Sequence, residues 1–139
     1  MARYLHASIL GAAALAAAAV VAAPRPVALA QAAPGVWEIS GYPGAKAPVR
    51  ECFGNLALLA QYEHRRENCS SSVVSDHAPS SVIQYSCPGG GFGRTTVTMI
   101  TPRSLRIETQ GISDNLPFNY TLQARRVGDC PSHSSASAR

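Results

Sequence analysis

Four cysteines constrain the fold of this 139-residue chain more than any other feature. They are separated by 16, 17 and 42 residues, and no histidine lies at ligand spacing from any of them. A zinc site normally needs clustered ligands, such as a C-x-x-C pair. An even number of separated cysteines in a small exported domain instead predicts two disulfides. The cysteines are Cys52, Cys69, Cys87 and Cys130, and they can pair in three ways.

Residues 1–30 have the form of a secretory signal peptide. Arg3 supplies a charged start, an alanine-rich apolar run covers 8–23, and Ala28-Leu29-Ala30 is a small-residue cleavage pattern. The apolar run is about 16 residues long, shorter than the roughly 20 needed to span a bilayer. We therefore predict cleavage after Ala30, a periplasmic or secreted location, and no integral membrane segment in the mature chain.

The mature chain from Gln31 onward is predicted to be one domain over 31–130, followed by a disordered, serine-rich tail over 131–139. Without Arg3 and Arg25 it keeps ten basic and eight acidic residues, a net charge of 10 − 8, near +2. This charge is too small to predict binding to nucleic acid or to an acidic membrane. We expect no metal and no cofactor.

Segments of alternating apolar and polar residues predict β-strands along most of the mature chain. Turn residues separate them at intervals of roughly ten residues, which is typical of antiparallel sheets and barrels. One helix is expected over 56–64, with Asn55 as its N-cap. We predict a mainly β (α+β) fold, a curved antiparallel sheet or partly open barrel with one short helix. The expected strands are 35–40, 49–53, 70–76, 81–87, 95–100, 105–109 and 118–125.

Four glycines within 89–93 raise the question of a phosphate-binding loop. Such a loop needs a strand before it and a helix after it, so that the helix N-terminus faces the anion. The residues after Gly93 are rich in threonine and valine and predict a strand instead. We therefore interpret 89–93 as a hairpin connection that uses residues tolerant of positive φ.

For the disulfides we favour Cys52–Cys69 with Cys87–Cys130. The first bond would staple the helical excursion to the sheet, and the second would tie the chain end back to it. The pairing Cys52–Cys130 with Cys69–Cys87 stays open.

Five short pieces of sequence follow one another in a distinctive order. They are P-G-V-W-E-I, E-C-F-G-N, E-N-C-S, S-C-P-G-G-G and R-V-G-D-C. This order resembles the bacterial exported family called domain of unknown function 3617, over Pro34 to Cys130. Many members have a Met- and Pro-rich stretch after the first strand, whereas 42–48 holds no methionine. The resemblance implies a fold and a compartment, and no activity.

No pattern of a known catalytic centre stands out. A G-x-S-x-G elbow is missing, the cysteines are too far apart for a thiol redox pair, and the acidic residues show no distinctive pairing. His77 beside Asp76 could act as a base, but both are expected in a surface turn. Asp129 beside Cys130 is expected to pair with an arginine or cap a turn.

The leading functional hypothesis is a non-catalytic exported domain that binds a small apolar ligand or an envelope protein. The ligand-binding residues are unknown, although four large side chains are candidates either for a concave apolar face or for the core. One alternative is an enzyme of unrecognised type with His77 or an acid at the sheet rim. Another is a purely structural or stress-related envelope protein. The four candidates are Trp37, Phe118, Tyr120 and Leu122.

Overall fold

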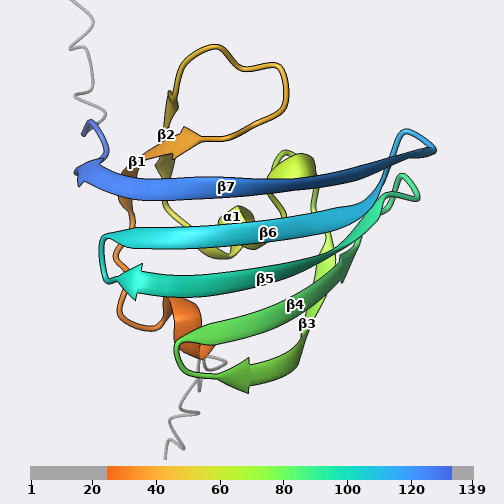
Figure 1. Ribbon diagram of the computed structural model, residues 1–139, viewed down its shortest axis with the longest axis horizontal. Coiled ribbons are helices and arrows are strands. Elements are labelled where there is room, and N and C mark those ends of the chain that lie inside the picture. The colour runs from red at the N-terminus through yellow and green to blue at the C-terminus, as the bar shows by residue number, and fades with distance from the viewer. Residues whose placement is uncertain (1–24, 133–139) are drawn as a thin grey trace, which may run out of the picture.

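The computed structural model describes residues 25–132, so residues 1–24 of the predicted signal peptide (1–30) and residues 133–139 of the predicted tail (131–139) lie outside the described residues. One antiparallel sheet of seven strands curves around a short helix, as Figure 1 shows, in the order β2-β1-β7-β6-β5-β4-β3. The predicted mainly β fold is therefore confirmed. The strands are β1 Gly35–Ser40, β2 Val49–Phe53, β3 Ser70–His77, β4 Ser80–Ser86, β5 Phe92–Thr101, β6 Ser104–Ser113 and β7 Leu116–Gly128.

Four strands are longer than the alternating pattern predicted, β3 by one residue and β5, β6 and β7 by four or five. β5 begins at Phe92 rather than at residue 95, because Gly93 pairs in register with Gly111 of β6. The β6–β7 hairpin closes through Asp114 and Asn115, both at positive φ, which suits a two-residue turn. Glycine is neither clearly apolar nor polar, so the alternating pattern did not extend the predicted strands to these glycines.

The connection between β4 and β5 is a turn, as predicted for the glycine-rich segment. Gly90 has a φ of 92°, and the Cys87 amide donates to the carbonyl oxygen of Gly91 at 2.8 Å. The turn covers 87–91, and Phe92 and Gly93 already belong to the strand.

The predicted helix over 56–64 is divided into two parts. Helix α1 covers Ala57–Ala60, and the 3-10 helix η2 covers Tyr62–His64. Gln61 leaves the helical conformation between them, at φ −116° and ψ 39°, and its side-chain amide donates to two later carbonyl oxygens. The N-cap position is Leu56 rather than the predicted Asn55, but Oδ1 of Asn55 still accepts from the Ala57 amide at 3.0 Å.

The concave side of the sheet holds the core. Inward-facing residues of the central strands meet Leu59 of α1, and the 3-10 helix η1, Val27–Leu29, covers one end. Among the described residues, no helix is long and apolar enough to cross a membrane. The fully buried apolar side chains include Trp37, Val97, Leu105, Ile107 and Leu122.

The favoured disulfide pairing was wrong, and the alternative is the observed one. The bonds are Cys52–Cys130, with Cα atoms 5.4 Å apart, and Cys69–Cys87, at 4.1 Å. Their partners follow from strand register. Ser70 pairs with Ser86, which places the residue before β3 opposite the residue after β4.

The Cys52–Cys130 bond also follows from strand register. Val36 of β1 pairs with Cys52 on one side and with Gly128 of β7 on the other. The end of β7 therefore runs close to β2, where Cys130 meets Cys52. The favoured Cys52–Cys69 bond across the helical segment is not compatible with this pairing of the strands.

We predict that the two bonds contribute unequally to stability. Loop-closure entropy assigns about 4–5 kcal/mol to Cys52–Cys130, which spans 78 residues, and about 3 kcal/mol to Cys69–Cys87, which spans 18. Paired Cys→Ser variants, unfolded in urea, should show that difference in the free energy of unfolding. Non-reducing peptide mapping should join Cys52 to Cys130, and a peptide joining Cys52 to Cys69 would contradict the fold.

Candidate functional site

The apolar residues considered for a ligand-binding face lie in or beside the core. Trp37 and Leu122 are 0% exposed and Tyr120 is 8% exposed. Phe118 is half-buried and packs against His64 and Tyr120, with ring centroids 5.9 and 5.8 Å apart. The helices and the N-terminal segment cover the concave side, so Trp37, Tyr120 and Leu122 serve as core. Phe118 packs against that core and is also among the residues that line the hollow described below.

Asp76 and His77 are the last two residues of β3 rather than part of the expected turn, and no hydrogen bond joins their side chains. The Asp76 carboxylate accepts from the hydroxyl of Ser81 at 2.6 Å and from the amide of Val27 at 2.9 Å. These two hydrogen bonds, the first above all, lower the pKa of Asp76. His77 donates from Nδ1 to the backbone carbonyl of Asp76 at 2.7 Å, and both residues are exposed. The carboxylate is thus committed to the fold.

A buried polar layer joins the helical segment to the sheet. Oε2 of Glu63 accepts from the hydroxyls of Tyr120 at 2.7 Å and Tyr42 at 3.3 Å. Burial first, and the hydrogen bond to Glu63 second, raise the pKa of Tyr120 well above its usual 10. A carboxylate that holds two phenols in one place fixes the orientation of η2 against β7.

A second acid anchors the other side of η2. Arg65 donates to both oxygens of Glu51, from Nε at 3.0 Å and from Nη2 at 2.9 Å. Its guanidinium also lies 4.1 Å from the ring centre of Tyr62, whose hydroxyl donates to Glu51. The pair therefore ties η2 to β2.

His64, the last residue of η2, is buried. Its Nδ1 and the hydroxyl of Tyr85 lie 3.1 Å apart and share a hydrogen bond. Its Nε2 faces Gly91, where any Cβ would collide with the ring. Ligand atoms of His64, Glu67 and Cys87 lie within 4.8 Å of one another, but the Cys87 sulfur is bonded to Cys69 and offers no thiolate.

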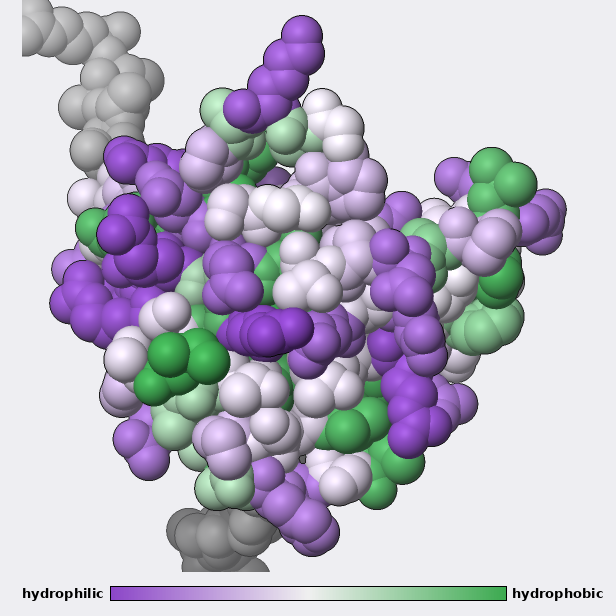
Figure 2. Space-filling model, in the orientation of Figure 1, coloured by the Kyte–Doolittle hydropathy of each residue, from purple (hydrophilic) through white to green (hydrophobic). Residues whose placement is uncertain are grey.

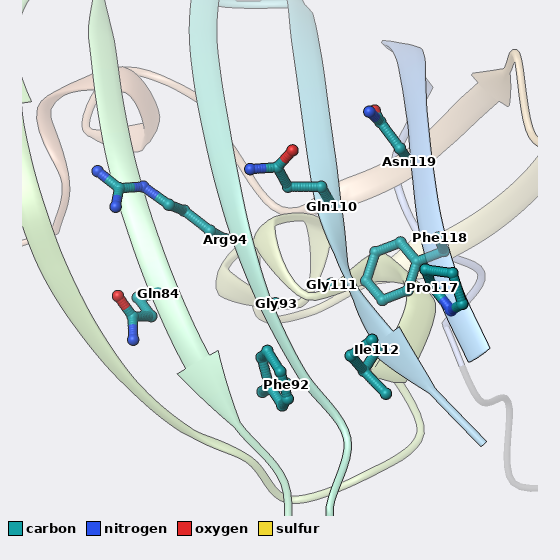
Figure 3. A pocket seen from close by; sticks show the side chains of 10 residues that line it. All are labelled: Gln84, Phe92, Gly93, Arg94, Gln110, Gly111, Ile112, Pro117, Phe118 and Asn119. Atoms are coloured by element: carbon teal, nitrogen blue, oxygen red, sulfur yellow. The ribbon is translucent and has the colours of Figure 1, made fainter. Parts of the chain in front are cut away.

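The outer face of the sheet carries a shallow hollow of about 550 Å³. Outward-facing residues of β5, β6 and β7 line it in two adjacent rows set by register. The first row is Phe92, Ile112 and Pro117, and the second is Arg94, Gln110 and Asn119. Figure 3 shows the polar side chains of the second row above the strands, with Gln84 of β4 beside Arg94. We call this set of residues the outer hollow.

The outer hollow combines an apolar edge with amides and one cation. Phe92 is 50% exposed, which is unusual for an aromatic ring on a mainly hydrophilic face (Figure 2). Within residues 25–132, the guanidinium of Arg94 makes no ion pair and no hydrogen bond. No acid is among the residues that line the hollow. Its chemistry therefore favours a ligand with an apolar part and a neutral or anionic polar part.

The sequence analysis missed every polar residue of the outer hollow. Arg94 and Gln110 lie just outside the strands predicted over 95–100 and 105–109, whereas Gln84 and Asn119 are outward positions of predicted strands that look like any other such position. Only the pairing of Arg94 with Gln110, and of Gln110 with Asn119, brings three strands' side chains together. The exposed phenylalanine after three glycines is the one local signal that could have pointed here.

Comparison with protein-family models, with curated proteins and with solved structures found no match to this chain.

We predict that a side chain at residue 93 destabilises the fold, whereas a side chain at residue 89 does not. A Cβ at residue 93 would lie 2.5 Å from the hydroxyl oxygen of the buried Tyr85, whereas one at residue 89 would meet only the flexible Glu67 side chain at 3.6 Å. Gly93→Ala should lower the free energy of unfolding by about 1–3 kcal/mol, the usual cost of overpacking. Gly89→Ala, the matched control, should stay near zero in the same urea titration. Equal effects would contradict the packing described.

Two buried tyrosines should make the fold sensitive to alkali. Burial, with the charge of Glu63 as the second cause, raises the pKa of Tyr85 to about 12, and the pKa of Tyr120 is also raised. The unfolded chain loses these protons near pH 10, so the stabilising effect of both is complete below pH 10. The part due to Tyr85 is lost as the pH rises through 12, and the part due to Tyr120 is lost at still higher pH.

Absorbance at 295 nm should therefore show phenolate formation by Tyr85 and Tyr120 only as the protein unfolds. In Tyr85→Phe the fall in stability between pH 10 and 12 should become shallower. An unchanged slope would contradict a raised pKa at this residue.

Proposed function

We propose that this protein is an exported, non-catalytic binding domain of the bacterial envelope. The observation that carries the proposal is the outer hollow, in which the unpaired cation of Arg94 lies beside the exposed ring of Phe92. The occupant that fits this chemistry is a small amphipathic anion, with its apolar part against the Phe92 row and its charge at Arg94. Gln84, Gln110 and Asn119 can donate to or accept from its polar groups.

Export is supported by the two disulfides, which suit an oxidising compartment. The order of sequence motifs from Pro34 to Cys130 also supports it through the resemblance to domain of unknown function 3617. A binding role is favoured over catalysis because Asp76, Glu63 and Glu51 are each held by hydrogen bonds that orient structural elements.

A fluorescence titration with 8-anilinonaphthalene-1-sulfonate, an aromatic anion, tests the proposal on the folded, oxidised protein. We expect saturation at one probe per chain. Phe92→Ser and Arg94→Gln should each weaken binding about fivefold, since a contact worth about 1 kcal/mol changes Kd by that factor.

The matched control is Ile100→Ser, at the far end of the same strand. Ile100 is 59% exposed and lies outside the outer hollow, so its replacement should leave the affinity unchanged. If Ile100→Ser weakens binding as much as Phe92→Ser does, the probe responds to surface hydrophobicity alone, and the proposed site is wrong.

A further inference from the structure

The segment just before β1 is packed into the core of the domain rather than extending into solvent. Within Val27–Leu29, Ala28 is 0% and Leu29 2% exposed, and Ala32 is 4% exposed. Figure 1 shows this segment, in orange, against the ends of the strands that form the β3–β4–β5 side of the sheet. These side chains are part of the same core as the residues of β5 and β6.

Polar groups of β3 and β4 hold the backbone of this segment. The amide of Val27 donates to Oδ1 of Asp76 at 2.9 Å, and the amide of Ala28 donates to Oγ of Ser81 at 3.0 Å. Ser81 is fully buried and donates its own hydroxyl proton to Asp76 at 2.6 Å. Loss of residues 27 and 28 would therefore leave a buried hydroxyl without its donor.

The following residues continue the attachment up to β1. The indole Nε1 of Trp37 donates to the carbonyl of Ala33 at 3.2 Å. Arg126 of β7 donates to the carbonyl of Pro34 from Nε at 3.0 Å and from Nη2 at 2.8 Å. Hydrogen bonds thus attach this segment to the sheet at both of its ends, at residues 27–28 and at residues 33–34.

We infer that residues 25–34 are an integral part of the folded domain, and that the leader is cleaved before Arg25 rather than after Ala30. The inference rests on the export proposed above. A cut after Ala30 would remove Ala28 and Leu29 from the core. It would also place a new charged amino group on Gln31, next to the buried Ala32, whose amide donates to the Leu29 carbonyl at 3.2 Å.

The sequence offers suitable processing sites upstream. Ala17-Ala18-Ala19 and Val20-Val21-Ala22 both place a small or short residue at the positions that a signal peptidase reads. The cleavage itself is hydrolysis of one peptide bond by water, which leaves a carboxylate on the leader and an amino group on the domain. Either site would deliver a chain that still contains the whole fastened segment.

The test expresses the full precursor in a bacterial host, purifies the exported protein from the periplasmic fraction, and measures its intact mass and melting temperature. The expected mass corresponds to an N-terminus between residues 20 and 25. Leu29→Ala in the same precursor should lower the melting temperature of the exported protein by roughly 10 °C or more, because it opens a cavity in the core. Ala30→Ser, at the exposed neighbouring position, should leave it unchanged.

An exported chain that starts at Gln31 would overturn the inference, and Leu29→Ala would then have no effect on its melting temperature. An uncut chain in the cytoplasm would overturn the proposed export and the cleavage site together. Only that last outcome counts against the proposed function, so the two failures are distinguishable by fraction and mass.

Discussion

The pairing of two glycines, Gly93 on β5 with Gly111 on β6, is the constraint on which both faces of the sheet depend. On the inner face, the hydroxyl of Tyr85 lies where a Cβ of residue 93 would be, and the Phe118 ring occupies the same place over residue 111. These rings can meet His64 only because the two residues beneath them, Gly93 and Gly111, have no side chain. On the outer face, the same two glycines line the hollow. Core packing and the shape of the outer hollow are therefore coupled.

The polar layer beneath the sheet has a different purpose from the outer hollow, although it contains more ionisable groups. Glu63 and Glu51 each accept hydrogen bonds from groups on other elements, and these bonds orient η2 between β2 and β7. A group that is fully engaged in this way is costly to release for chemistry, because its partners would then be buried without hydrogen bonds. Arg94 makes no such hydrogen bond or ion pair within the described part of the chain, which is why the binding proposal rests on it.

Local signals predicted most of the fold, and long-range register explains what they left out. Alternation located all seven strands, and Asn55 marked the start of the helix to within one residue because its hydrogen bond to the Ala57 amide is a local interaction. The predicted disulfide pairing was wrong because it assumed that one bond closes the helical segment and did not consider the β3–β4 hairpin. That hairpin was itself predicted, and antiparallel pairing of its strands places Cys69 opposite Cys87. The outer hollow needs three registers at once, and no single segment of the sequence contains that information.

Arg126 shows how the two ends of the domain are held by one side chain. Its guanidinium donates to the Pro34 carbonyl before β1 and to the carboxylate of Asp129, which confirms the expected pairing of Asp129 with an arginine. The next residue, Cys130, is bonded to Cys52 on β2. A disulfide limits how far the end of β7 can separate from β2, but it does not by itself align the N-terminal segment with them. Arg126 supplies that alignment. The attachment of residues 25–34 and the disulfide at the C-terminal end therefore hold the two ends of the domain together.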